Sequence, residues 1–404
     1  MRSLTIYNLL GESLVCTFIL LLLIGCSNED NQNESELVKY TVSLNVIQEG
    51  YDGKECWLHP RACKCGDNND ILLLMQPWVT SHSDFYQFLY EKWSYDEGEN
   101  WTVPQSLESV LGEKWEDDDQ IRICDVNPQW HQKSKKILAT GVTVHYKDSA
   151  EYTPSPRETC YFYYNPDSRK WSPWKILRMP DLPEFFHSSV GCSQWVDCPN
   201  GDILLPIYFL RDPNIINYSV TVLRCHFDGE ILKYIEHGNY LDLDRVRGFC
   251  EPSLIQFKGR YYLTLRNDVN GMVTVSDDGL NYKKPVEWMF NDSTYVNTEN
   301  TQQHWVKSPK ALFLVYTSSG RKESENMFRG RAPLFIAQFD DKKMCLIKET
   351  ENIIIPNTGA GLGNFGAFDL NDHVSYVTTS EDMDEEALRK GANGRVIVAK
   401  IHWN

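Results

Sequence analysis

The sequence contains little that predicts helices, linkers or a basic surface. Lysine and arginine number 40 against 56 aspartate and glutamate residues, which gives a net charge of −16. Nucleic acid requires the opposite balance, because its phosphates bind basic surfaces. No Pro-, Gly- or Ser-rich stretch divides the chain after residue 37, and helical patterning is confined to residues 381–390. A nucleic-acid partner is therefore excluded, and a single large domain rich in strands is expected.

The apolar stretch near the N-terminus is too short to favour a membrane span. Residues 14–25 have the length of the apolar part of a signal peptide, and Arg2 precedes them. The stretch ends in Leu23-Ile24-Gly25-Cys26, which resembles a bacterial lipobox, and a polar tether follows. We expect a lipoprotein signal peptide at 1–25, a tether at 26–37 after lipidated Cys26, and one folded domain at 38–404. This predicts a lipid anchor in a bacterial cell envelope; an ordinary signal peptide with a chance cysteine is the alternative.

The twelve cysteines are scattered. Cys63-Lys64-Cys65 lacks a second pair at zinc spacing, so we expect no metal and no other cofactor. Export would permit disulfides, whereas cysteines in strand-like stretches are typical of buried free thiols. We expect one or two disulfides, whose pairing the sequence cannot assign.

A short run of apolar and β-forming residues, which we call a strand phrase, recurs six times and indicates the fold. The phrases start 66, 66, 58, 51 and 62 residues apart. They occupy residues 71–75, 137–141, 203–207, 261–265, 312–316 and 374–378. Repeats of this size are typical of repeat architectures, and six blade-like units can close into a ring without a long free edge. We therefore predict an all-β, six-bladed β-propeller, with residues 38–46 forming an early strand that could close the ring with the last blade.

Residues 94–101, Ser-Tyr-Asp-Glu-Gly-Glu-Asn-Trp, fit the Ser-x-Asp-x-Gly-x-x-Trp turn called an Asp-box. The serine and aspartate side chains can bond backbone amides in the turn, and the glycine permits a positive φ. Residues 276–282 form a shortened copy, and residues 165–171 a more degenerate one. These turns predict hairpins of propeller blades and carry no catalytic role.

With these turns, the chain resembles the sialidase-like (neuraminidase, BNR) six-bladed propellers. The resemblance implies that three arginines from different blades hold a substrate carboxylate. Arg61, within Trp57-Leu58-His59-Pro60-Arg61-Ala62, stands in the place of the first. Arg266, fifteen residues after Glu251, matches the second, and Arg331, before Ala332-Pro333-Leu334, matches the third. The planar guanidinium suits this task because it makes two parallel charge-assisted hydrogen bonds to a carboxylate.

The resemblance also implies a catalytic pair of acids. Asp84 stands where the family has its acid, and Glu251 would act as base or nucleophile, or would position one. The chain departs from the family late in the sequence, where the family has a nucleophilic tyrosine. Residues 361–366 read Gly-Leu-Gly-Asn-Phe-Gly, so Asn364 or a phenylalanine occupies that place. Another nucleophile, an inverting mechanism, a lyase and an inactive protein all remain open.

Several further polar residues precede blade strands and are candidates for the site. His304, in the polar segment Thr301-Gln302-Gln303-His304-Trp305, is a suitable proton-transfer group. Secondary candidates share a position before a predicted strand, where the alternative is a hydrogen-bonded turn residue: His59, His131, Gln194, Gln303 and Asn364.

Together these features predict an exported glycoside hydrolase of sialidase-like type. It would remove a terminal acidic sugar, sialic-acid-like or uronic, from a glycan or polysaccharide. The alternatives are a propeller polysaccharide lyase, whose unsaturated product absorbs in the near ultraviolet, and a glycan-binding lipoprotein without activity.

Overall fold

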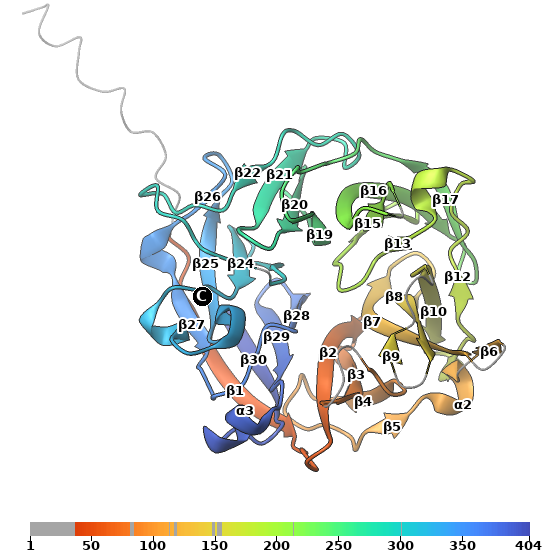
Figure 1. Ribbon diagram of the computed structural model, residues 1–404, viewed down its shortest axis with the longest axis horizontal. Coiled ribbons are helices and arrows are strands. Elements are labelled where there is room, and N and C mark those ends of the chain that lie inside the picture. The colour runs from red at the N-terminus through yellow and green to blue at the C-terminus, as the bar shows by residue number, and fades with distance from the viewer. Residues whose placement is uncertain are drawn as a thin grey trace, which may run out of the picture. The chain divides into compact units, whose positions relative to one another are not determined.

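Each of the six apolar phrases forms the second strand of a blade in the computed structural model. The structure describes residues 37–80, 85–112, 114–116, 119–147, 150–151, 156–212, 214–299 and 301–404. These strands are β3 (Asp70–Val79), β8 (Lys136–Lys147), β15 (Asp202–Leu210), β20 (Arg260–Arg266), β24 (Leu312–Tyr316) and β29 (Val374–Ser380). Most of their residues are buried, because each blade packs between two neighbours. The fold is a six-bladed β-propeller, as the sequence predicted (Figure 1).

The inner strand of each blade pairs with that second strand and lies nearest the axis (Figure 1). The inner strands are β2 (Glu55–Cys65), β7 (Asp119–His131), the split pair β13 (Ser188–Ser189) and β14 (Val196–Asp197), β19 (Cys250–Phe257), β23 (His304–Lys307) and β28 (Gly366–Asn371). The remaining strands complete the blades: β4 (Tyr90–Ser94), β5 (Gln105–Ser106), β6 (Lys114–Glu116), β9 (Ala150–Glu151), β10 (Thr159–Asn165), β11 (Lys170–Trp171), β12 (Lys175–Ile176), β16 (Asn217–Phe227), β17 (Leu232–His237), β18 (Arg247–Gly248), β21 (Met272–Ser276), β22 (Val286–Glu287), β25 (Leu334–Asp340), β26 (Cys345–Leu346), β27 (Asn352–Ile355) and β30 (Val396–Trp403).

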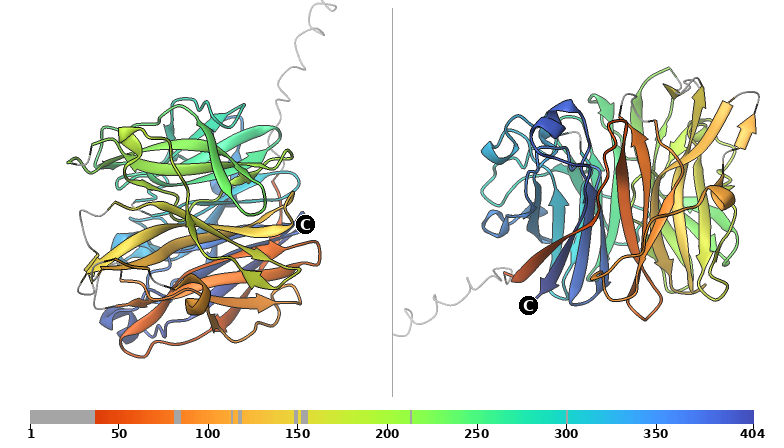
Figure 2. Two further views of the ribbon diagram at one scale, coloured as in Figure 1. Left: turned by 90° about the vertical axis from the view of Figure 1, so that its right-hand side faces the viewer. Right: turned by 90° about the horizontal axis from the view of Figure 1, so that it is seen from below.

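The first strand closes the ring. β1 (Tyr40–Gln48) pairs antiparallel with β30, the last strand, so that Tyr40 lies opposite Trp403 and Val46 opposite Ile397. The sixth blade is thus built from both ends of the domain, and β2 of the first blade packs against β28 and β29 (Figures 1 and 2). The prediction of an early strand that closes the ring is confirmed.

The cysteines of the described residues are all free thiols, so the expectation of one or two disulfides is wrong. The reason is that most of these side chains point into blade cores. Cys63 and Cys160, for example, pack in one apolar cluster with Leu72 and Phe162. There they act as small apolar side chains.

The turn after β4 has the hydrogen bonds that its sequence predicted. Ser94 Oγ accepts from the amide of Gly98, and Asp96 Oδ1 accepts from the amide of Asn100. Gly98 has φ +83°, and a methyl group there would lie 3.1 Å from the ring of Tyr376 in the sixth blade. Only glycine suits both the backbone and this close approach. The turn therefore helps to join the first and sixth blades, and it takes no part in the cavity described below.

Within the described ranges, helices are few and short, as expected. They are α2 (Glu108–Leu111), α3 (Glu385–Arg389) and the 3₁₀ helices η1 (Pro183–Phe185), η2 (Lys322–Ser324), η3 (Phe328–Gly330) and η4 (Lys348–Thr350). α3 lies in the segment predicted to be helical, and the Asp384 side chain caps it by accepting from the amide of Ala387. Among the described residues, no helix is long and apolar enough to cross a membrane. The predicted signal peptide, Cys26 and the tether up to residue 36 lie outside the described residues.

Candidate active site

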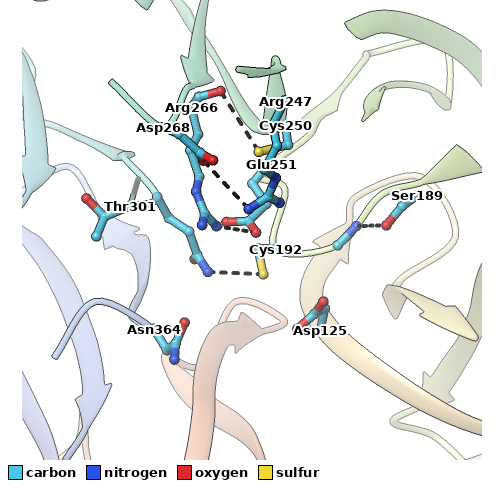
Figure 3. Close-up of polar contacts among 12 residues, drawn as sticks. Asp125, Ser189, Cys192, Arg247, Cys250, Glu251, Arg266, Asp268, Thr301 and Asn364 are labelled. Carbon is cyan, nitrogen blue, oxygen red and sulfur yellow. Dashed lines mark hydrogen bonds and ion pairs between the residues drawn. The ribbon is translucent and has the colours of Figure 1, made fainter. Parts of the chain in front are cut away.

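Equivalent positions on the six blades meet at one end of the ring. They contribute one residue each, spaced at nearly the same intervals as the strand phrases: His59, Asp125, Cys192, Glu251, Gln302 and Asn364. All six line a cavity of about 380 Å³. Figure 3 shows the side chains of Asp125, Cys192, Glu251 and Asn364 around one central space, although they come from four blades. The ring therefore joins residues that are far apart in the sequence.

Backbone irregularities turn four of these residues toward the axis. The pairing of β2, β7 and β19 with their second strands shifts register at His59, Asp125 and Glu251, respectively. These three residues have left-handed backbones, with φ values of 50°, 53° and 42°, and Cys192 has φ 68°. A bulge re-aims a side chain, and such backbone conformations cost roughly 1–3 kcal/mol each. Strain repeated around one cavity marks it as the candidate site.

The cavity has an excess of positive charge. Among the described residues that line it, three are acidic: Asp125, Glu251 and Asp382. Five are arginines: Arg157, Arg247, Arg266, Arg329 and Arg331. This local balance is opposite to that of the whole chain, whose net charge is −16. Clefts lined by one sign of charge attract ligands of the other sign, so the cavity is suited to an anion.

Glu251 and Arg266 form a buried ion pair at the cavity wall (Figure 3). Their side chains are 15% and 7% exposed. Although burial alone would raise it, Arg266 and Arg247 hold the pKa of Glu251 below its ordinary value. Glu251 therefore stays ionised at neutral pH, and its second oxygen, Oε2, is buried without a hydrogen-bond partner.

Asp382 is a second carboxyl group of the cavity, and its pKa is shifted in the opposite direction to that of Glu251. Its Oδ2 is 3.8 Å from Nη1 of Arg331 and accepts a hydrogen bond of 3.3 Å from the side-chain amide of Asn364. Its Oδ1 is buried without a hydrogen-bond partner. Burial raises the pKa of Asp382 to about 6, in spite of the opposing effect of Arg331. The cavity thus holds one carboxyl that favours the ionised form and one that gains a proton readily.

Glycines in the late loop allow the chain to pass against these residues. A methyl group at Gly361 would lie 3.1 Å from Oδ2 of Asp382, and one at Gly363 would lie 3.0 Å from Cγ of Arg331. This is the segment where the resemblance implies a tyrosine. Asn364 faces the cavity instead, and the ring of Phe365 packs edge-on against His304 in the interior.

Arg61 is fully buried beside the cavity and is not among the residues that line it, whereas Arg266 and Arg331 are. It is 1% exposed, and Nη2 donates a 2.9 Å hydrogen bond to Oε1 of Gln302. The bulge in β2 explains the difference, because it turns His59 toward the cavity and places Arg61, two residues later, in the layer below.

His304 belongs to the same buried layer. Nδ1 lies 2.7 Å from Oγ of Ser253 and Nε2 lies 3.0 Å from Oε1 of Gln302. Burial and the nearby Arg61 lower the pKa of His304 to about 3. Its ring does not line the cavity but contacts Gln302, which does, and its predicted role in proton transfer stays a prediction.

Gln194 and Gln303 also serve the interior. The side-chain amide of Gln194 donates to the carbonyl oxygens of Trp305 and Ala367, which joins the third blade to the fifth and sixth. The amide of Gln303 donates to the carbonyl of Thr301. Neither is among the residues that line the cavity, so the structure does not bring these two secondary candidates together with Glu251 and Arg266.

His131 is the remaining histidine candidate. It lies away from the cavity, with Nδ1 2.8 Å from Oγ of Ser134 and Nε2 3.2 Å from the carbonyl oxygen of Gly201. Of the secondary candidates, His59 and Asn364 do line the cavity. Asp84 lies outside the described residues, so its role stays a prediction.

Comparisons with known proteins agree on the fold. No family model matches the sequence, and no curated protein does. A protein of unknown function from Dyadobacter fermentans matches with a TM-score of 0.63 and 15% identity, over 91% of this chain and 99% of that one. Trypanosoma rangeli sialidase matches with a TM-score of 0.60 and 13% identity, over 89% of this chain. The Hadza microbial sialidase Hz136 matches with a TM-score of 0.58 and 11% identity, over 86% of this chain.

This chain spans 59% and 65% of the lengths of those two sialidases. At such identities the likeness shows a shared fold alone. The chain is thus a sialidase-like six-bladed propeller in architecture, and its activity has to be argued from the cavity.

Three cavity residues have donor atoms close enough to surround a cation. Among the described residues, His59, Asp125 and Cys192 place one such atom each within 4.8 Å of the others. Each of the three already has a protein partner: His59 Nδ1 lies 3.0 Å from Oδ1 of Asp125, and Cys192 Sγ accepts from Gln302 at 3.2 Å. The charge of nearby Arg61 also opposes a cation, because it acts on both Asp125 and Cys192.

Sequence reasoning missed several residues of the site. Asp125, Cys192 and Gln302 could have been found, since they stand ten to twelve residues before a strand phrase, as His59 and Glu251 do. Asp382 stands four residues after the end of the last phrase and is not at the position that the six equivalent residues share. No local pattern distinguishes Arg157, Arg247 or Arg329 from surface arginines.

Proposed function

We propose that this protein is a glycosidase of sialidase-like type that removes a terminal acidic sugar from a glycan or polysaccharide. The observation that carries the proposal is the convergence of Arg266 and Arg331, from neighbouring blades, on one cavity that also holds Glu251 and Asp382. The cavity volume, about 380 Å³, lies within the range of about 300–1,000 Å³ that small-molecule sites have.

The charge of the cavity supports an acidic substrate. Five arginines face three carboxyl groups there, so an anionic group on the ligand would complete the balance. Arg331 is the best placed to bind it. Burial and the neighbouring Arg266 lower the pKa of Arg331, and its Nε is buried without a hydrogen-bond partner. A carboxylate bound to Arg331 would supply both a counter-charge for the guanidinium and a hydrogen-bond acceptor for its Nε.

The carboxyl groups support bond cleavage. Glycoside hydrolysis requires an acid that protonates the leaving oxygen and a second carboxylate that acts as base or nucleophile. Glu251, which stays ionised beside Arg266, suits the second role. The resemblance assigns the first role to Asp84. Tyr208 and Tyr218 also line the cavity, so the glycine-rich late loop does not leave it without a tyrosine.

A polysaccharide lyase is the second candidate, and one observation favours it. His187 lines the same cavity, and burial with the nearby Arg157 lowers its pKa to about 4. A neutral histidine can remove the proton next to a carboxylate whose charge arginines neutralise. Such a reaction would leave an unsaturated sugar.

The test is a screen of purified protein against sialylated glycans and uronate polysaccharides, with the products separated and identified. Release of an acidic monosaccharide supports the proposed hydrolase, and a product that absorbs in the near ultraviolet supports the lyase. Glu251→Gln should abolish release, while Arg260→Ala, at an exposed ion pair with Asp277, should not change it. Binding of an acidic glycan without turnover would show a glycan-binding protein.

We also propose that the protein is exported and anchored to a bacterial cell envelope through lipidated Cys26. The support is Leu23-Ile24-Gly25-Cys26 and the polar segment that follows. This would hold the cavity close to the cell surface, where polysaccharides and glycans are met.

A further inference from the structure

A second cavity adjoins the first. Its volume is about 510 Å³, and residues 326–331 and 382–390 contribute most of its walls. Five residues line both cavities: Trp78, Arg247, Arg329, Arg331 and Asp382. Among the described residues, Asp382 is the one carboxyl group shared by the two. It therefore marks the passage from the arginine-rich cavity to the outer one.

The walls of the second cavity are tied together and carry an exposed aromatic ring. Lys390 Nζ donates a 3.2 Å hydrogen bond to the carbonyl oxygen of Asn326, which joins the two segments, and it also pairs with Glu386 at 2.8 Å. Phe328, on η3, is 73% exposed. An aromatic ring beside a cavity offers a large apolar face to a ligand. With the charged side chains of the walls, the cavity thus presents both apolar and polar surface, which a sugar ring could contact.

We propose that the second cavity binds the leaving-group part of the glycan, at least one further sugar residue, and that Asp382 protonates the departing oxygen. The inference rests on the proposed hydrolase activity. If the acidic sugar occupies the first cavity and the next sugar the second, the bond between them lies at the passage. Among the described residues, Asp382 is the carboxyl group that lines both cavities, and its Oδ1 has no hydrogen bond to another protein group.

The reaction balances with water as the second substrate. Asp382 transfers its proton to the glycosidic oxygen while the C–O bond breaks, and the electron pair of that bond remains on the oxygen. Water then adds its hydroxyl to the sugar and releases one proton, which restores the carboxyl group. The environment agrees with this role, since burial raises the pKa of Asp382 while arginines lower that of Glu251. Two carboxyls whose pKa values are pushed apart are typical of acid and base partners.

The acid role is tested with two substrates that share the acidic sugar and differ in the leaving group. For a sialic acid these are a 4-methylumbelliferyl sialoside, whose leaving group needs little protonation, and sialyllactose. We expect Asp382→Asn to lower kcat/KM for sialyllactose by about 10²–10⁴-fold and for the aryl sialoside by much less. Asp84→Asn is compared with it, because the resemblance gives this role to Asp84. If Asp84→Asn shows this leaving-group dependence and Asp382→Asn does not, the assignment is overturned.

The subsite is tested with Phe328→Ala. We expect a rise in KM for sialyllactose of about tenfold with little change for the aryl sialoside, and Phe328→Tyr should restore the wild-type value. Tyr295→Ala is the matched control, since that ring is 53% exposed elsewhere on the surface. An equal effect on both substrates, or none on either, would overturn the subsite.

Calorimetry separates the subsite from the activity. If the wild-type protein cleaves no acidic glycoside, the proposed function and the acid role of Asp382 both fail. Binding of sialic acid and of sialyllactose to the wild type and to Phe328→Ala then still decides the subsite. The subsite is supported if the wild type binds sialyllactose more tightly than sialic acid and Phe328→Ala loses this difference. Equal affinities of the wild type for the two sugars contradict it.

Discussion

Glu251 and Arg266 are fifteen residues apart, yet they form an ion pair within the first hairpin of the fourth blade, where Cys250 of β19 lies opposite Arg266 of β20. The pair holds an ionised carboxylate at the cavity wall and positions the guanidinium of Arg266 near Arg331. Burial and the charge of Arg266 lower the pKa of Arg331. Both the charge of the cavity and the stability of this hairpin depend on it.

Removing one partner of this pair should destabilise the fold. Glu251→Gln leaves the buried guanidinium of Arg266 without its counter-charge, and losing one partner of a buried pair costs about 3–5 kcal/mol. Urea unfolding followed by tryptophan fluorescence measures the change in free energy of unfolding. Glu236→Gln is the control, because the Arg224–Glu236 pair is 41% and 45% exposed, and such pairs contribute about 0–1 kcal/mol. A similar loss in both variants would contradict a buried pair.

Arg331→Ala should weaken binding of an acidic sugar by roughly tenfold or more, which corresponds to about 1.4 kcal/mol per decade. The reason is that a carboxylate in the cavity would lose a bidentate partner. A neutral analogue that lacks the carboxylate should bind both proteins alike. Calorimetry with the two sugars checks this, and an equal loss for both would indicate that Arg331 has a structural role.

The activity should fall as the pH rises through about 6, where the buried Asp382 loses its proton. Besides burial, the groups that act on this carboxyl are Arg331, Asn364 and Asp384. A group with a raised pKa is protonated below that pKa, so the acid form is lost on the alkaline side. A pH profile of kcat/KM measures it. In Asp382→Asn the alkaline limb near pH 6 should be absent; if it persists unchanged, another group is the acid.

Cys26→Ser should release the protein from membranes and leave the fold unchanged. The expectation follows from Leu23-Ile24-Gly25-Cys26, which resembles a lipobox. Membrane fractionation and mass spectrometry of the mature N-terminus check it. Wild-type protein without a lipid, together with a Cys26→Ser variant that stays with membranes, would contradict the anchor.

The strands could be predicted from the sequence because blades bury them on both faces, which leaves apolar runs at regular intervals. The closing strand β1 was recognisable as well, since its alternating pattern stands alone before the first repeat. The disulfides were predicted wrongly, because spacing and export cannot show that cysteines such as Cys63 and Cys160 point into blade cores.

The site was predictable only in part. Glu251, Arg266 and Arg331 stand beside strands in the order that the resemblance requires, and all three line the cavity. Arg61 does not line the cavity, because a bulge shifts the register of β2 just before it, and no local pattern predicts a bulge. Asp382 was missed because its environment is created by a loop from another part of the sixth blade and by Arg331 of the fifth.

The central claim is that the arginine-rich cavity holds the acidic end of a sugar. A crystal structure of the protein soaked with an acidic monosaccharide tests it most directly. We predict that the sugar carboxylate lies about 2.7–2.9 Å from guanidinium nitrogens of Arg331 and Arg266, with its ring above Glu251 and its reducing end toward Asp382. A sugar bound outside this cavity, or in it with its carboxylate turned away from both arginines, would contradict the account.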